Sequence, residues 1–224
     1  MKKREIKGKR VNFCMSIVID TTGSMSPYIN ACKNNIVQIL NKLKMIERQY
    51  HLPPGGIVAQ VVQYKDYVDT MTGETEEYIT NDFNKLKNKL GSFTADGGAS
   101  GATSFCWCED IQGGLIRALR EMKRAPYDKY NHLILIIGDY PNHHEGSDCY
   151  CDYNYLLHTS FDVVWRMIFR DIRSFENIRV MFMPVGEAKI SLTKDRMQQS
   201  LGTRIVDSAS VSTETDFVDI ITNT

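Results

Sequence analysis

Residues 12–24 read NFCMSIVIDTTGS. The part from Asn12 to Ile19 is a nearly continuous apolar run rich in β-branched residues, and Asp20 closes it, which is typical of a strand buried on both faces. Ser26 can then cap a helix with Pro27 at its first position, because apolar residues recur at helical spacing beyond it. The chain therefore opens with a buried strand, a tight turn and a long helix.

Strand-like and helix-like segments alternate along the rest of the chain. Strands are predicted at residues 57–64, 132–138, 178–185 and 203–207, helices at 82–90, 109–123, 160–175 and 192–201, and a last amphipathic segment at 215–221. Parallel strands need crossover connections, and right-handed crossovers place helices on both faces of the sheet. This pattern predicts an α/β fold with a doubly wound, mostly parallel sheet. An extended piece near Tyr78 suggests an antiparallel strand at one edge.

Length and charge limit the classes of function. A chain of 224 residues suits one α/β domain, which we expect at residues 11–224 after a basic tail at residues 1–10. Basic and acidic residues both number 27, so no net charge directs the chain to nucleic acid or to an anionic membrane. No apolar run is long enough to cross a bilayer, and no secretion signal is evident. We expect a cytoplasmic protein, with the nucleus as the alternative; its oligomeric state stays open.

Oxygen-bearing side chains gather where two buried strands end. Asp20, Thr22 and Ser24 occupy alternate positions after the first strand, and Asp139 directly follows the apolar strand that ends at Gly138. Ligands of doubly wound sheets bind at the carboxyl ends of the strands. Carboxylates and hydroxyls are hard donors that suit Mg²⁺ or Mn²⁺. So few carboxylates leave the ion with open positions, which an Asp or Glu of a protein partner can fill.

These residues resemble a known signature. The stretch Asp20-Thr21-Thr22-Gly23-Ser24 is similar to the Asp-x-Ser/Thr-x-Ser motif of von Willebrand factor A (vWA) domains, whose metal-ion-dependent adhesion site (MIDAS) also uses an aspartate that closes a later strand, here Asp139. Residues 64–67 (YKDY) and 139–143 (DYPNH) resemble the subgroup associated with alpha-kinase-type proteins. The resemblance implies a Rossmann-like fold and metal-dependent protein binding without catalysis.

The second metal-binding loop departs from that subgroup. Where the subgroup has Gly-Gly-Gly-Asp, this chain has Gly97-Gly98-Ala99-Ser100-Gly101, followed by an apparent insertion that ends at Cys108. Alignment on the glycines makes Ser100 the next metal ligand. Other family members use a threonine there, which makes Thr103 the rival.

Four cysteines form a second pattern. Cys106 and Cys108 lie in the inserted loop, and Cys149 and Cys151 follow Asp139. We expect both pairs on one rim of the sheet, where they could hold a structural Zn²⁺, form a disulfide or remain unlinked thiols. His143, His144 and His158 could replace a cysteine as a zinc ligand. Cys14 and Cys32 are predicted core residues.

Two other functions stay open. The pair His143 and His144 beside Asp139 suggests a metal-dependent hydrolase in which a histidine acts as general base. Alternatively, the site has decayed and the domain is a metal-free scaffold. Aspartyl-phosphate chemistry is improbable, because Thr22 stands where those enzymes carry a second aspartate.

Overall fold

Five parallel strands form the central sheet of the protein. A computed structural model describes residues 12–65, 78–96, 109–142, 153–154, 159–186 and 190–207. The strands are β1 (Phe13–Asp20), β2 (Ile57–Tyr64), β3 (Asn131–Gly138), β6 (Ile178–Pro184) and β7 (Ile205–Asp207), and their order across the sheet is β2-β1-β3-β6-β7. All four pairings are parallel. The sheet predicted from alternating segments is confirmed.

The winding of the sheet reverses between β1 and β3. The chain leaves β1 to form β2 on one side of it, then returns to form β3 on the other side. In the register of these strands Asp20 lies opposite Tyr64, and Ile19 lies opposite Ile137. The three strands therefore end at the same level. Such a reversal point is where doubly wound folds bind their ligands.

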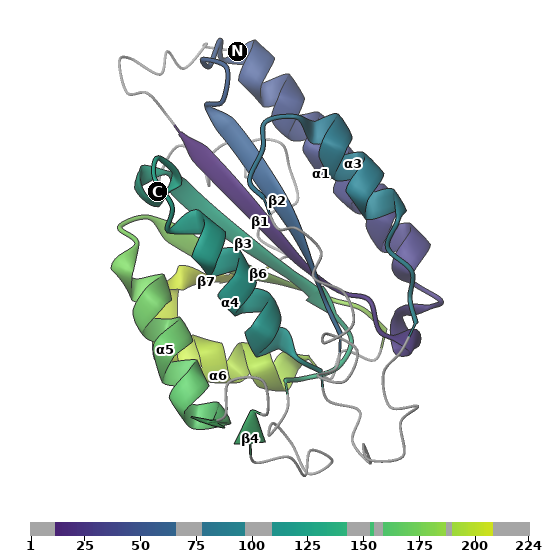
Figure 1. The fold of residues 1–224 in the computed structure, drawn as a ribbon, viewed down its shortest axis with the longest axis vertical. Coiled ribbons are helices and arrows are strands. Elements are labelled where there is room, and N and C mark those ends of the chain that lie inside the picture. The colour runs from purple at the N-terminus through teal and green to yellow at the C-terminus, as the bar shows by residue number, and fades with distance from the viewer. Residues whose placement is uncertain are drawn as a thin grey trace.

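Helices cover both faces of the sheet (Figure 1). One face carries α1 (Ile29–Gln49) and α3 (Phe83–Gly91); the other carries α4 (Ile111–Met122), α5 (Phe161–Ser174) and α6 (Ser191–Leu201). Side chains of β1 alternate between two cores: Ile17 packs with the first group, and Val18 packs with the second. A strand buried on both faces needs apolar residues at nearly every position, which explains the continuous run that opens the chain.

Several boundaries differ from the sequence-based prediction. The first helix begins at Ile29 rather than after Ser26, because residues 23–25 form a 3-10 turn whose Gly23 carbonyl accepts from the Ser26 amide at 3.0 Å. Strand β7 begins two residues late because residues 202–204 form another such turn. The segment after Asp139 includes a short antiparallel pair, β4 (Tyr153–Asn154) and β5 (Thr159–Ser160), where only a polar loop was predicted.

The edge of the sheet beside β2 carries part of the predicted antiparallel hairpin. Thr80 forms an isolated antiparallel bridge with Ala59 of β2, with both backbone hydrogen bonds at 2.9 Å. The amphipathic segment at 215–221 lies outside the described residues. Within the described ranges, every helix is too short or too polar to span a membrane.

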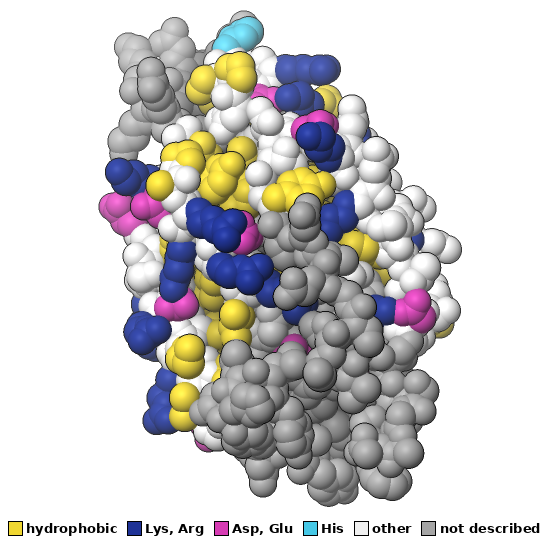
Figure 2. All heavy atoms as spheres, in the orientation of Figure 1, with side chains coloured by type: hydrophobic (Ala, Val, Ile, Leu, Met, Phe, Trp, Pro, Cys, Tyr) yellow, Lys and Arg dark blue, Asp and Glu magenta, His cyan; other side chains and the backbone are white. Residues whose placement is uncertain are grey.

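Charged side chains connect α4 and α5 on the outer surface. Figure 2 shows Lys and Arg side chains gathered over this face of the molecule. Lys123, directly after α4, pairs with Asp171 of α5 at 2.5 Å, and at the same end of α4 Glu121 accepts from Arg124 at 2.7 Å. These acidic groups are thus neutralised within the protein. Ion pairs with one solvent-exposed partner contribute about 1 kcal/mol each, so the two apolar cores hold the fold together.

Gly114 allows α4 to approach the sheet closely. A Cβ atom at this position would lie 2.9 Å from Cγ1 of Val18 and 3.1 Å from Cβ of Tyr64. Both side chains are buried and the contacted atoms lie close to the backbone, so neither can move aside easily. Gly114 therefore lowers the helix propensity of α4 but allows the helix to pack closely against the sheet.

We predict opposite effects for two glycine-to-alanine substitutions in helices. Gly114→Ala should lower the free energy of unfolding by about 1–3 kcal/mol, because overpacking strains the core. Gly91→Ala is the matched control, since nothing lies within 4 Å of its Cβ position; it should raise the free energy of unfolding by up to about 1 kcal/mol. Urea unfolding measures both. Equal effects would contradict the close packing at Gly114.

Candidate metal site

The four side chains singled out after β1 and β3 form one hydrogen-bonded chain. The backbone N–H and the hydroxyl of Thr22 donate to Oδ1 of Asp20 at 2.8 and 2.7 Å. The hydroxyls of Thr22 and Ser24 are 3.1 Å apart, and Ser24 donates to Oδ1 of Asp139 at 3.2 Å. Residues 115 positions apart in sequence therefore meet at the reversal point of the sheet. Asp20, Thr22, Ser24 and Asp139 lie together, as the sequence predicted.

A glycine permits this convergence. Gly138 follows Ile137, which pairs with Ile19, so the strand ends of β1 and β3 lie side by side. A Cβ at Gly138 would clash with the Tyr64 hydroxyl and lie 3.3 Å from Cβ of Asp20. The space is instead used by Tyr64, whose hydroxyl donates to the Ile137 carbonyl at 3.3 Å. Tyr64 thereby supports the floor of the site.

Both carboxyl groups of the site are buried. Asp20 is 0% exposed and Asp139 is 7% exposed. Burial raises the pKa of Asp20 to about 7, although hydrogen bonds from Thr22 lower it, and the charge of Asp139 adds to the rise. Burial also raises the pKa of Asp139. Two adjacent buried carboxyl groups favour either a proton or a cation.

The donor set fits a hard divalent cation. Oδ2 of Asp20 is buried and accepts no hydrogen bond from any described residue, although an unpaired buried oxygen is costly. The neighbouring donors are carboxylate and hydroxyl oxygens, which suit Mg²⁺ or Mn²⁺. Within the described ranges, no three His, Cys, Asp or Glu side chains converge on one point, so the candidate site consists of two carboxylates and two hydroxyls.

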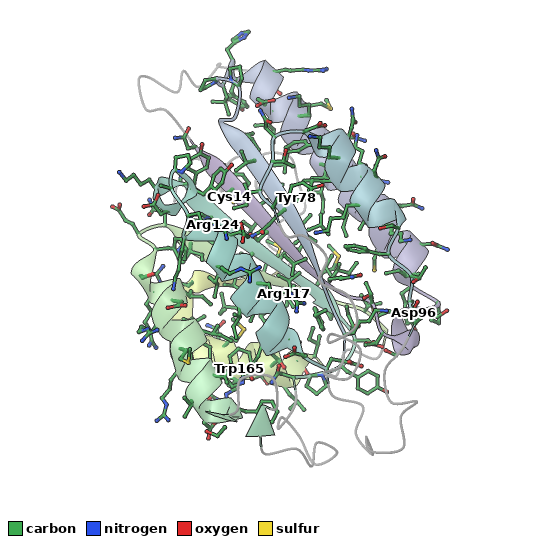
Figure 3. The ribbon with its side chains drawn as sticks, in the orientation of Figure 1. Cys14, Tyr78, Asp96, Arg117, Arg124 and Trp165 are labelled. Carbon is green, nitrogen blue, oxygen red and sulfur yellow. The ribbon has the colours of Figure 1, made fainter. Side chains whose placement is uncertain are left out.

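The segment that carries the next candidate ligand is anchored at this site by both ends. Ser100 and Thr103 lie outside the described residues. Before them, the Asp96 amide donates to the Thr21 carbonyl at 3.2 Å, and the Asp96 carboxylate pairs with Lys65 at the end of β2. After them, the Glu109 amide donates to the Pro141 carbonyl at 3.0 Å. Figure 3 shows Asp96 beside the turn that follows β1.

Two further acidic residues lie near the site, and sequence reasoning did not include them. Asp110 is 0% exposed and caps α4 by accepting from the Gly113 amide at 2.8 Å; Glu109 is 5% exposed. Burial raises the pKa of Tyr64 well above its usual value, and the charges of Asp20, Glu109, Asp139 and Asp110 add to the rise. The acidic pair directly before an apolar helix was the signal that could have indicated them.

The cysteine pairs and the histidines lie outside the described residues: Cys106, Cys108, Cys149, Cys151, His143, His144 and His158. Some residues near the pairs in sequence are described. Glu109, next to Cys108, forms a bridge with Asn142. Tyr153, two positions after Cys151, pairs with Ser160, and Gln112 donates to the adjacent Phe161 carbonyl at 2.9 Å. The flanking residues thus meet near the start of α4. Cys14 and Cys32 are buried free thiols, as predicted.

Comparison with known proteins identifies the fold. No family model and no curated protein matches the sequence. The vWF domain of the type V pili tip protein Mfa5 from Porphyromonas gingivalis has a similar structure, with a TM-score of 0.55 at 12% identity over 96% of both chains. The chain has a vWA-like fold.

A second solved structure agrees. The pilus adhesin SpaC from Lactobacillus rhamnosus GG matches with a TM-score of 0.54 at 11% identity over 95% of this chain. The vWA-like chain described here spans 31% of the SpaC chain, and its match to a three-domain Mfa5 structure covers 23% of that chain with a TM-score of 0.43. At these identities the comparisons establish the fold.

The buried carboxyl of Asp20 predicts a distinctive pH dependence. In metal-free protein the folded state holds a proton on Asp20 up to about pH 7, whereas the unfolded state releases it near 3.8. The free energy of unfolding should therefore fall as pH rises through this window and stay low above it. Asp20→Asn removes the titrating group. In EDTA above pH 7, we expect it to raise the melting temperature by about 3 °C or more.

The same variant tests the role of the cation. Mg²⁺ should raise the melting temperature of the unaltered protein above pH 7, because a ligand that binds only the folded state stabilises it. It should leave Asp20→Asn unchanged. Calorimetry in EDTA and in Mg²⁺ measures both effects. Two results together would indicate that Asp20 has only a structural role. Asp20→Asn would be less stable than the unaltered protein in EDTA, and Mg²⁺ would not stabilise the unaltered protein.

Proposed function

We propose that this chain is a protein-interaction module that binds an acidic residue of its partner through a bound Mg²⁺ or Mn²⁺ ion, in the manner of a MIDAS. Asp20, Thr22, Ser24 and Asp139 would hold the ion, with Ser100 or Thr103 as a further ligand. The observation that carries the proposal is the buried Oδ2 of Asp20, which accepts no hydrogen bond from the described residues and lies within a cluster of hard oxygen donors.

The chemistry of these donors favours binding. A divalent ion would supply positive charge to two buried carboxylates and leave coordination positions for an incoming carboxylate. Thr22 and Ser24 orient Asp20 and Asp139 through the hydrogen bonds at 2.7 and 3.2 Å. We propose binding without a catalytic step, since the described side chains of the site are carboxylates and hydroxyls that could coordinate an ion. The alternative of a hydrolase that uses His143 or His144 as general base remains a prediction from the sequence.

The comparisons support an interaction role at the level of the fold. Mfa5 is described as a pili tip protein and SpaC as a pilus adhesin. Membership of the alpha-kinase-associated subgroup and a cytoplasmic location remain predictions from the sequence. We propose a protein as the partner, in preference to nucleic acid or membrane, because a carboxylate matches the ion.

A pair of serine substitutions tests ion binding. Ser24→Ala should weaken Mn²⁺ binding about tenfold or more, because it removes a hydroxyl that both coordinates and orients. Ser26→Ala is the matched control: Ser26 is exposed, and its amide, which the substitution keeps, makes its hydrogen bond to Gly23. Titration monitored by Mn²⁺ electron paramagnetic resonance gives both affinities. Failure of the unaltered protein to bind Mn²⁺ or Mg²⁺ would instead favour a metal-free scaffold.

Partner capture tests the second half of the proposal. Partners retained by the immobilised protein in Mg²⁺ should be released by EDTA and should be absent with Asp20→Ala. Partners that stay bound in both cases would show that binding does not depend on the metal. The thermal stability of the variant, measured in parallel, shows that the protein is folded.

Elemental analysis of the purified protein addresses the cysteines. One Zn²⁺ per chain, lost in a variant with Cys106 and Cys108 both changed to Ser, would support a zinc site shared by the two cysteine pairs. We expect this zinc to be independent of Asp20. Protein without zinc but with a cross-linked peptide containing Cys149 or Cys151 in mass spectrometry would indicate a disulfide.

A further inference from the structure

Few large apolar side chains are exposed in the described part of the chain. They are Tyr28, Met45, Met167 and Leu192, with exposed fractions of 37%, 59%, 42% and 44%. Met45 and Met167 lie on the outer surfaces of helices α1 and α5. Tyr28 and Leu192 differ. Tyr28 directly precedes α1, Leu192 lies in the first turn of α6, and both helices begin at the carboxyl edge of the sheet.

Tyr28 is exposed but held in place. Its ring lies against Gly186: a Cβ at Gly186 would be 3.1 Å from the Tyr28 hydroxyl oxygen and 3.3 Å from the ring. Gly186 also has a φ of +62°, which favours glycine. The preceding residue, Val185, donates to the Gly138 carbonyl at 3.0 Å, so Gly186 is next to the end of β3. The Tyr28 ring therefore packs against the segment that is bonded to the end of β3, the strand that Asp139 follows.

Leu192 is held in a similar way from the first turn of α6. Ile190 is 1% exposed, and its amide donates to the Asp139 carbonyl at 3.1 Å. Thr193 is 0% exposed, and its hydroxyl accepts from the Asn142 amide at 2.8 Å. Leu192 lies between these two anchors, yet its side chain is 44% exposed. The backbone on both sides of Leu192 is therefore held, which lowers the entropy lost when a partner covers this residue.

We propose that Tyr28 and Leu192 form an apolar rim that recognises an apolar side chain adjacent to the partner's acidic residue. This inference rests on the proposed function, because the acidic residue would bind the ion beside Asp139. Tyrosine is enriched among residues that dominate binding energy, and apolar contacts around an ion pair exclude water from it. The partner segment would thus combine a carboxylate with a neighbouring leucine, isoleucine or aromatic residue.

Three synthetic peptides provide the probes. The first contains Leu-Asp within a Gly/Ser sequence, the second Ser-Asp and the third Leu-Asn. Binding to the full chain is followed by NMR titration in excess Mg²⁺ and again in EDTA. We expect the Leu-Asp peptide to bind about fivefold more tightly than Ser-Asp in Mg²⁺, as burial of part of a leucine side chain implies. The Leu-Asn peptide and the EDTA samples should show no binding.

Substitutions at the rim locate the residues responsible for the Leu-Asp preference. Leu192→Gln and Tyr28→Ala should reduce the ratio between the Leu-Asp and Ser-Asp affinities to about one, while Mn²⁺ affinity stays unchanged. Met45→Gln and Met167→Gln are the controls, since they remove apolar side chains that are at least about as exposed from other surfaces. They should leave the ratio at about five. Melting temperatures of all four variants confirm that each is folded.

The outcomes separate this inference from the proposed function. Mg²⁺-dependent binding of both Asp peptides with equal affinity would overturn the apolar rim and leave the metal-dependent module intact. A Leu-Asp preference that survives Leu192→Gln and Tyr28→Ala would also overturn the rim. Absence of Mg²⁺-dependent binding by every peptide would overturn the proposed function and the rim with it.

Discussion

The structure around the site depends on the register between β1 and β3, which ends both strands at the same level. The pairing of Ile19 with Ile137 ends both strands at one height, so the side chain of Asp20 lies beside Gly138 and within reach of the residue that follows it. A shift of one residue would turn the side chains of β3 to the opposite faces and separate the two carboxylates. Two apolar cores hold this register, and each receives alternate side chains of the same strands.

The fold satisfies only one of the two carboxylate oxygens of Asp20. Thr22 satisfies one oxygen of Asp20 through its amide and its hydroxyl, whereas the other oxygen is buried with no hydrogen bond from the described residues. Burial of such an oxygen costs free energy that the apolar cores must offset. A protein that needs the carboxylate only for its own stability would gain from an amide or an apolar residue here. The proposed ion would satisfy this oxygen.

Patterns along the chain were sufficient for the sheet and for four of the side chains at the site. The apolar run at residues 12–19 specified a doubly buried strand, and Asp20 and Asp139 marked the ends of two such strands. Sequence did not predict the start of α1, because Ser26 and Pro27 satisfy the rules for a helix start while the turn that directs Ser24 towards Asp139 uses the same residues. Nor could it place Glu109, Tyr28 or Leu192 near the site, since their positions depend on contacts between distant segments.

The anchoring of residues 96 and 109 has a consequence for how the site can change. Thr21 and Lys65 hold one end of the intervening segment, and Pro141 holds the other, so the sheet does not depend on the length between them. Doubling a flexible loop adds only about 0.6 kcal/mol of closure entropy. Changes in the length of the chain between these anchors are thus inexpensive. Residues that ligate the metal or contact a partner could therefore be exchanged between positions 96 and 109 while the rest of the domain stays unchanged.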